Sequence, residues 1–262
     1  MAKEDKRNRL AEIISILQQR NGASVKQLAE ELNVTEMTIR RDIKILQTND
    51  VINIFHGSVV LNPNKSVAEG KAYYDIFYSS GVMESEKNAI GREAATLIKE
   101  GDSVFFDIGT TVEAMVRHLP IGLDITAICF SLNILEELRR KKITKLIFGG
   151  GYYHPDTQAF ECDDMRRFFS GIRATKAFLS PAGISENIGL TCVKQYEEQI
   201  KKTMFENAEK CIVLADSSKF DVVKPSYIGP LAKVDTLITD AKVSEEWKAL
   251  LAKEKVECVV AR

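Results

Sequence analysis

The chain has 262 residues, and its 36 Lys and Arg residues nearly balance 37 Asp and Glu residues, for a formal net charge of −1. This balance excludes a positive field over the whole protein as the drive for nucleic-acid binding, and the length suffices for two domains that each bury a core. No segment reaches transmembrane length and the N-terminus lacks the apolar stretch of a signal peptide, so we expect a cytoplasmic protein without a membrane partner.

The first 48 residues carry the pattern of three amphipathic helices. Apolar residues of the first helix share one face: Leu10, Ile13, Ile14 and Leu17. The second helix follows Ser24, which forms an S-x-x-Q capping box with Gln27, and Asn33 is expected to stop it. Thr35 can cap the third helix, where apolar positions recur at helical spacing: Ile39, Ile43 and Leu46.

Once that apolar stripe is buried, the third helix presents a polar and cationic face: Glu36, Thr38, Arg40, Arg41 and Lys44. A cationic helix held across a short turn by a supporting helix is typical of a helix-turn-helix, whose second helix enters the major groove. The alternative is a pair of surface helices whose arginines are merely solvated. Residues 1–65 hold 10 Lys and Arg against 8 Asp and Glu, which is a weak excess of the expected sign.

A β-hairpin over residues 51–61 is expected next, with its turn at His56-Gly57, where glycine can supply a positive φ. Three helices and a hairpin make a winged helix-turn-helix. Residues 38–42, Thr-Ile-Arg-Arg-Asp, then resemble the T-I-R-R-D signature of the DeoR family of bacterial repressors, and residues 56–58, His-Gly-Ser, keep part of its H-G-G wing motif. The wing departs from the family pattern at Asp50, Ile54 and Ser58. The resemblance implies that double-stranded operator DNA is bound by Thr35, Glu36, Thr38, Arg40, Arg41, Lys44 and His56.

We expect a DNA-binding domain at residues 1–61, a linker at 62–84 and an α/β domain at 85–262. In the last, helices at 86–99, 112–119 and 132–141 alternate with strands at 103–106, 125–130, 145–148, 177–180, 211–215, 236–239 and 256–260. Short buried strands that alternate with helices indicate a mostly parallel sheet. Five cysteines without a CxxC pair favour a reducing compartment, and three of them, Cys129, Cys211 and Cys258, fit buried strands.

Ligands of such sheets bind at the carboxyl ends of the strands, where this chain places small and polar residues. They are Asp107, Gly109, Thr110 and Thr111 after the first strand, Ser131 and Asn133 after the second, Gly149 and Gly150 after the third, and Lys219 in a later loop. Glycine and hydroxyl groups at a helix N-terminus suit a phosphate. Each loop alone is more often an ordinary turn or cap, whereas their recurrence at one edge favours a site. No P-loop or dinucleotide-binding motif stands at a strand end.

The same loops resemble the sensor domains of the DeoR family, which carry D-x-G-T-T, a Gly-Gly pair and D-S-S-K-F. The resemblance implies a sugar-phosphate sensor with a fold like ribose 5-phosphate isomerase, with the phosphate at residues 109–111 and a contribution from Lys219. Pro181-Ala182 stand where most relatives offer an aspartate, so hydroxyl recognition must differ there. His154 and Glu161 are candidate substitutes for sugar contacts, and the alternative is that they are plain surface residues.

We therefore expect a transcriptional regulator, in particular a repressor of a sugar or deoxyribonucleoside catabolic operon, released by a phosphorylated sugar. Deoxyribose 5-phosphate is the first candidate on resemblance alone. No catalytic residue, metal site or cofactor is expected, and paired DNA modules imply a homo-oligomer. One alternative is an isomerase-like enzyme fused to a DNA-binding module, although Pro181-Ala182 remove its best carboxylate base. Another is a DNA-packaging protein without a ligand, which would not explain the phosphate-type loops.

Overall fold

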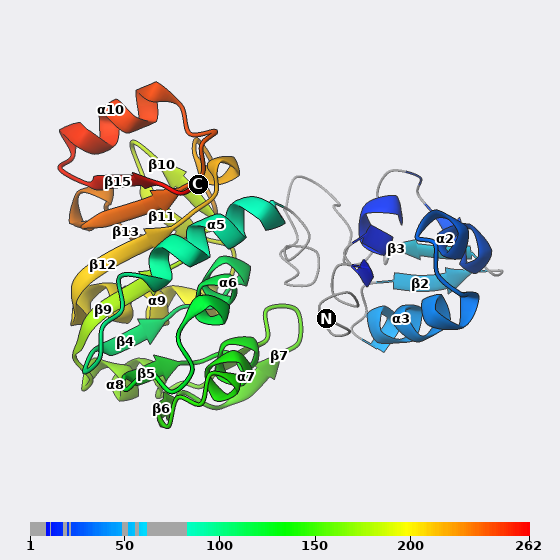
Figure 1. Ribbon diagram of the computed structural model, residues 1–262, viewed down its shortest axis with the longest axis horizontal. Helices are drawn as coiled ribbons and strands as arrows, with labels where there is room; N and C mark the ends of the chain where they lie inside the picture. Colours follow the sequence, from blue (N-terminus) through cyan, green and yellow to red (C-terminus); the bar gives the residue numbers. More distant parts are fainter. Residues whose placement is uncertain are drawn as a thin grey trace. The chain divides into compact units, whose positions relative to one another are not determined.

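The computed structural model describes residues 9–10, 12–17, 20, 22–48, 52–55, 58–61 and 83–262 (Figure 1). The chain divides into two compact units, Met1–Val82 and Met83–Arg262. The predicted wing turn at His56-Gly57 and all but the last two residues of the predicted linker at 62–84 lie outside the described residues. Glu84, the last residue of that linker, already begins a helix. Among the residues that are described, no helix combines the length and apolar character needed to cross a membrane, and no cluster of His, Cys, Asp and Glu could hold a metal ion.

The N-terminal unit is helical at residues 9–10, 12–17 and 20, and continues with α2 (Val25–Glu31) and α3 (Glu36–Thr48). A small antiparallel sheet has the strand order β1-β3-β2, formed by β1 (Ala23–Ser24), β2 (Ile52–Phe55) and β3 (Ser58–Leu61). The predicted hairpin is therefore present, and β1 adds a short strand that was not predicted. The apolar stripes of the helices and three strand residues, Ala23, Ile52 and Val59, form one buried core.

Local sequence determines the turn between α2 and α3. The Ser24 side chain accepts from the Gln27 N–H at 3.2 Å while Gln27 Oε1 accepts from the Ser24 N–H at 2.8 Å, which confirms the predicted capping box. Asn33 has φ of 49° just after α2 ends, in the left-handed region that asparagine tolerates. Thr35 Oγ1 accepts from the Thr38 N–H at 3.2 Å at the start of α3. These caps fix the angle at which α3 leaves its supporting helix.

The second unit contains a seven-stranded sheet with the order β15-β14-β12-β9-β4-β5-β6, in which every neighbouring pair is parallel. Its strands are β4 (Ser103–Phe106), β5 (Thr126–Cys129), β6 (Lys145–Phe148), β9 (Ala174–Leu179), β12 (Ala208–Leu214), β14 (Thr236–Thr239) and β15 (Glu257–Val260). Three of them have the predicted bounds, and the other predicted strands are displaced by one to three residues at their ends.

Helices cover both faces of this sheet (Figure 1). One face packs against α5 (Glu84–Ala95), α6 (Thr110–His118) and α7 (Leu132–Arg140) through a core that includes Val104 and Phe106. The other face packs against α8 (Met165–Ser170), α9 (Gln195–Asn207) and α10 (Glu245–Lys253) through a core that includes Phe105 and Phe169. Because both faces are covered, the strands are mostly apolar, and their charged residues stand near the strand starts or at partly buried positions.

Two smaller antiparallel elements were not predicted. One is the hairpin of β7 (Tyr152–His154) and β8 (Ala159–Glu161), which follows the carboxyl end of β6. The other is a sheet of β10 (Gly183–Ser185), β11 (Gly189–Cys192) and β13 (Ser226–Gly229). These short strands mix glycine, polar and apolar residues without a continuous apolar run, so the sequence does not distinguish them from loops. Short 3₁₀ turns, η1 (Ser217–Lys219) and η2 (Leu231–Lys233), complete the unit.

Candidate functional site

The outer face of α3 is the candidate DNA-binding surface. Glu36, Arg40, Arg41 and Lys44 are exposed, whereas Ile39 and Leu46 are fully buried beneath them. Arg40 Nη2 lies 3.4 Å from Glu36 Oε2, and both side chains of this ion pair are exposed to solvent. Predicted contacts at Thr35 and Thr38 fall at the start of the helix, where their hydroxyls lie 2.9 Å apart within the cap. The predicted contact at His56 lies outside the described residues.

A buried ion pair holds α3 in place from its inner side. Asp42 is 1% exposed and accepts from Arg9 Nε at 2.6 Å, which joins α3 to the first helix. Asp42 belongs to the same five-residue run as Arg40 and Arg41, yet it faces the opposite way. The Thr-Ile-Arg-Arg-Asp run therefore combines two outward cations with one inward anchor.

At the carboxyl edge of the large sheet, the loop after β4 leads directly into α6. Gly109 has φ of 120°, a conformation that L residues rarely adopt, and its carbonyl accepts from the Glu113 N–H at 3.0 Å. Thr110 is half-buried and Thr111 is buried in the first turn of α6. The first N–H groups of a helix have no partners within it, so this turn is suited to bind an anion.

Asp107 begins this loop but does not face its outer side. It is fully buried, and Oδ1 accepts from the Ile108 N–H at 2.8 Å while Oδ2 accepts from the Ser180 N–H at 2.9 Å and from Lys201 Nζ at 2.6 Å. Both carboxylate oxygens are thus engaged by protein groups. We replace the expected ligand contact at Asp107 with a positioning role, since it ties the loop after β4 to the loop after β9.

Lys201 and Glu197 on α9 complete this buried cluster. Lys201 Nζ lies 3.6 Å from Glu197 Oε2 and donates to the Ser180 carbonyl at 3.3 Å, and both side chains are buried. Burial raises the pKa of Glu197 to about 7; Asp107 acts in the same direction and Lys201 opposes it. The sequence analysis did not identify these two residues, although both stand in the apolar stripe of α9 with Ile200 and Met204. A charge inside an apolar stripe is the signal that could have found them.

Buried polar atoms without a hydrogen-bond partner gather at this same edge. Within the described part of the chain they are Ser131 Oγ, Asn133 Oδ1, Asp216 Oδ2 and Thr239 Oγ1. Each belongs to the last residue of a strand in the sheet or to one of the few residues that follow. Native proteins rarely leave buried polar groups unpaired, so these atoms make this edge of the sheet a candidate site for a polar ligand.

Two lysines stand beside Asp216, one of these residues. Lys219 Nζ, partly exposed, lies 3.9 Å from Asp216 Oδ2, and Asp216 itself caps η1 through the Ser218 N–H at 3.1 Å. Lys87 on α5 is buried, and burial lowers its pKa to about 8; Asp216 opposes that shift and Lys219 adds to it. Lys87 was not predicted, although it occupies the apolar stripe of α5 with Ile90 and Ala94.

The packing of α5 against α6 brings Lys87 to the loop at residues 107–111, which follows β4. Gly91 is so close to α6 that a Cβ there would lie 2.6 Å from the Met115 nitrogen and 2.7 Å from the Ala114 carbonyl carbon. Lys87 precedes Gly91 by one helical turn, and Thr111 precedes Met115 by one turn. Helix α5 precedes β4 and helix α6 follows it. In an alternating α/β arrangement each helix runs back from the carboxyl edge of the sheet to its amino edge, so both helices begin at the carboxyl edge. Lys87 and the N-terminus of α6 therefore lie at the same edge of the sheet.

Gly149, the first glycine after β6, has a different explanation from the one expected. The Gly149 N–H donates to the Cys129 carbonyl at 2.9 Å, and a Cβ at Gly149 would lie 2.3 Å from Met165 Sδ. Its small size serves packing against α8, so we do not keep Gly149 as a ligand contact. Gly150 has open space around its Cα, and a ligand contact there stays a prediction.

His154 and Glu161 are brought together on the β7–β8 hairpin, where His154 Nε2 and Glu161 Oε2 lie 2.7 Å apart. The His154 ring stacks on Tyr196 of α9 with centroids 3.8 Å apart, and the Tyr196 hydroxyl lies 2.8 Å from Thr157 Oγ1. Glu161 and Tyr196 also line a cavity of about 620 Å³. Sugar contacts at the two predicted residues stay a prediction, with Tyr196 as the partner that sequence reasoning missed.

The same hairpin borders the unpartnered Ser131. Ala159 forms an isolated bridge with Ser131, and the Gln158 carbonyl accepts from the Leu132 N–H at 2.8 Å at the start of α7. On α7, Asn133 Nδ2 donates to Glu113 of α6 at 2.9 Å. The predicted site residues after β4, β5 and β6 thus belong to elements that contact one another.

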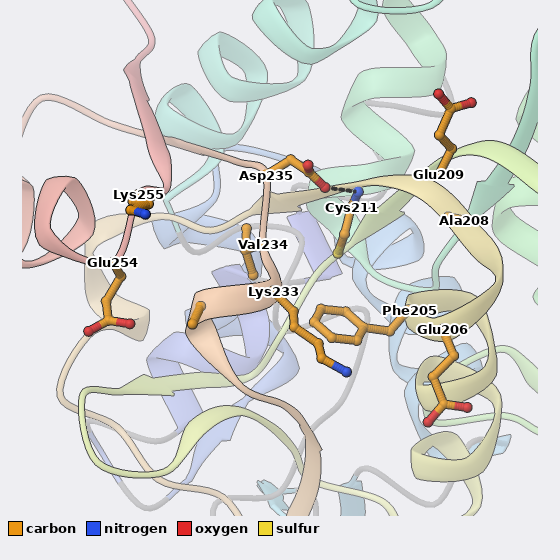
Figure 2. Close-up of a pocket in the computed structure, with 11 residues that line it drawn as sticks. Phe205, Glu206, Ala208, Glu209, Cys211, Lys233, Val234, Asp235, Glu254 and Lys255 are labelled. Atoms are coloured by element: carbon orange, nitrogen blue, oxygen red, sulfur yellow. Dashed lines mark hydrogen bonds between the residues drawn. The ribbon is translucent and has the colours of Figure 1, made fainter.

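A second cavity, of about 560 Å³, lies at the opposite edge of the sheet, where β12, β14 and β15 begin (Figure 2). Phe205, Lys233 and Glu254 line it, and Asp235 Oδ2 accepts from the Cys211 N–H at 2.8 Å. None of the four unpartnered atoms lies among its lining residues. This amino-edge cavity is separate from the candidate site.

Comparisons with known proteins agree with both units. Residues 9–65 match the model of the DeoR-like helix-turn-helix domain, and residues 83–241 match the model of the DeoR C-terminal sensor domain. The deoxyribose operon repressor of Escherichia coli (strain K12) is 28% identical over 91% of this chain and 92% of its own length. The HTH-type transcriptional repressor GlcR of Bacillus subtilis (strain 168) is 30% identical over 96% of this chain and 95% of its own.

Among solved structures, ribose 5-phosphate isomerase A from Methanocaldococcus jannaschii is similar over 53% of this chain and 55% of that chain, with a TM-score of 0.39 and 20% identity. The expected fold class, an N-terminal helix-turn-helix domain followed by a parallel-sheet α/β domain, is confirmed. Both of the relatives described above are named repressors. The chain belongs to the DeoR family of DNA-binding transcriptional regulators.

Proposed function

We propose that the protein represses a sugar-related catabolic operon and leaves its operator when a phosphorylated sugar binds at the carboxyl edge of the large sheet. The observation that carries this proposal is the concentration of unpartnered buried polar atoms at that edge, among the residues that the structure describes. Hydroxyls of Ser131 and Thr239 can donate to an anion, whereas Asn133 Oδ1 and Asp216 Oδ2 can only accept. Ser131 and Asn133 follow β5, whereas Asp216 and Thr239 stand at the ends of β12 and β14, so the two pairs flank β4 and its loop at residues 109–111. Each pair offers one hydroxyl and one acceptor to a ligand whose phosphate lies at that loop.

The phosphate is assigned to residues 109–111, at the N-terminus of α6, with Lys219 and Lys87 as the neighbouring cations. A dianionic phosphate favours the charged form of a lysine, so ligand binding offsets the loss of solvation of Lys87. Deoxyribose 5-phosphate is the first candidate, since one relative is named a deoxyribose operon repressor. Other pentose and hexose phosphates follow it.

For release, the ligand must bind the DNA-free conformation more tightly than the DNA-bound one, because a ligand indifferent to the two states shifts nothing. We assign DNA binding to a homo-oligomer, since one helix-turn-helix offers few base contacts and paired modules read two half-sites. Sedimentation of the full chain at micromolar concentration tests this assignment. A monomer that still binds its operator tightly would contradict it.

The direct test titrates candidate sugar phosphates against a preformed protein–operator complex, with the sugar followed by NMR. Lys219→Ala and Thr110→Val should still bind the operator and fail to release it, which is the behaviour of a super-repressor. The matched control is Lys233→Ala, a lysine at the amino edge of the sheet (Figure 2). Failure of every candidate to release the wild type would overturn the proposal, and turnover of the sugar would restore the enzymatic alternative.

A further inference from the structure

The exposed face of α3 contains one apolar side chain among its charges. Met37 is 62% exposed, and only it and Ile54 of β2 are exposed large hydrophobic residues in the described part of the N-terminal unit. A single exposed apolar side chain is common on protein surfaces, so Met37 is informative only through its place on the candidate DNA-binding face of α3.

Helical geometry places Met37 inside the cationic stripe. Arg40, Arg41 and Lys44 follow it at three, four and seven residues, which is the spacing of one helix face. All four are exposed, and the opposite stripe, with Ile39 and Ile43, is buried. Whatever surface meets the two arginines therefore also meets Met37.

The other side chains of the first turn of α3 have partners within the helix. Glu36 lies 3.4 Å from Arg40, and the Thr38 hydroxyl lies 2.9 Å from Thr35 Oγ1. Met37 stands between them at the N-terminal end, the part of a recognition helix that reaches base edges. Its position suits direct base contact rather than contact with the phosphate backbone.

We propose that Met37 is a specificity-determining residue that reads a thymine through its C5-methyl group. This inference rests on the proposed function, because it requires α3 to enter the major groove. The thymine methyl is the apolar feature of the major-groove code, and the other direct contacts there are hydrogen bonds. A flexible, polarisable methionine side chain packs readily against such a group. Burial of one methyl-sized group is worth roughly fourfold in affinity.

The test begins with selection of binding sites from a random duplex pool by the full-length wild type. Each thymine of the selected half-site is then replaced by uracil, which removes only the methyl group. We expect the wild type to lose about fourfold in affinity at one thymine per half-site. Met37→Ala should lose no further affinity when that thymine is replaced, and Met37→Leu, which keeps an apolar side chain, should retain the methyl dependence. Gln47→Ala, an exposed change nearer the C-terminus of α3, should behave as the wild type.

The outcomes separate this inference from the proposed function. A wild type that selects no sequence would overturn the proposed function, and the reading of thymine with it. If the wild type selects a clear site, and Met37→Ala loses as much affinity as the wild type when the thymine methyl is removed, the inference alone would be overturned. A changed sedimentation coefficient in Met37→Ala, with its selected site unchanged, would also overturn it by showing that another copy of the chain covers Met37.

Discussion

Helices α3 and α9 are each 13 residues long, and both carry charges close to an apolar stripe. In α3 the arginines and the lysine lie outside the stripe and are exposed, whereas in α9 Glu197 and Lys201 lie within it and are buried. Charges of the first kind remain available to a macromolecular partner. Charges of the second kind are engaged by the protein itself, and their removal should affect folding before it affects binding.

The largest expected effect concerns Lys201. Lys201→Met leaves Asp107 and Glu197 buried without their cation, so the free energy of unfolding should fall by about 3–5 kcal/mol. The neighbouring Lys202 is a matched control, since it is partly exposed and pairs with Glu198 at 2.6 Å. Lys202→Met should cost less than about 1 kcal/mol. Urea unfolding of the full chain measures both, and equal losses would remove the distinction between buried and exposed charge.

The next effect is a pH dependence carried by Glu197. Its pKa is raised from 4.5 to about 7 in the folded protein, so between these values the folded state holds a proton that the unfolded state has lost. The free energy of unfolding should therefore fall as pH rises from about 5 to about 7, and this decline should be shallower in Glu197→Gln. Thermal unfolding over that range tests it. Parallel curves for the two proteins would show that Glu197 is ionised throughout.

The exposed charges of α3 should behave in the opposite way. Arg40→Ala and Arg41→Ala should each weaken operator binding by about 1–3 kcal/mol, if bidentate to a base, while unfolding is unchanged. Lys44→Ala should weaken specific and non-specific binding alike and reduce the salt dependence, as expected of a phosphate contact. Arg139→Ala, an exposed arginine of α7, is the charge-matched control. Unchanged affinity in a folded Arg40/Arg41 double variant would reject α3 as the reading helix.

The smallest effect concerns the helix that supports α3. Ser24→Ala removes the capping box of α2 and should lower stability by about 1 kcal/mol, with little change in operator affinity at temperatures where the chain is folded. Ser244 caps α10 by a bond of the same length, 3.2 Å to the Trp247 N–H, but without the reciprocal glutamine bond. Ser244→Ala should therefore cost less. A larger loss of stability in Ser244→Ala than in Ser24→Ala would show that the bond from the Ser24 N–H to Gln27 adds nothing to stability.

Local patterns predicted what depends on local physics. The capping box, the stop at Asn33 and the exposed face of α3 all follow from spacings of three or four residues, and each is present in the structure. The strands at 103–106, 145–148 and 236–239 have the predicted bounds, because continuous apolar runs between turn residues are distinctive. The loops at the carboxyl edge could also be predicted, since parallel strands bring their ends together.

Contacts between distant segments could not be predicted. Asp107 was expected to face a ligand, whereas its partners Ser180 and Lys201 are 73 and 94 residues away in the chain. Gly149 was read as a phosphate-type glycine, but its closest neighbours are Met165 and Phe169 of a helix that had not been predicted there. A single sequence gives the spacing within an element and not the side chains that another element brings to it.

The β7–β8 hairpin has a consequence for how such sensors diversify. Its strands pair with each other, and side chains join it to α9, through Thr157 to Tyr196 and Asp156 to Lys194. Its contacts with the segment that follows β5 include main-chain bonds, which do not depend on the identity of the hairpin side chains. Replacement of hairpin residues therefore leaves the register of the parallel strands, and the loop at residues 109–111, unaltered. Under the proposed function, substitutions confined to the hairpin, about ten residues, can change which sugar is bound while the phosphate-binding loop stays the same.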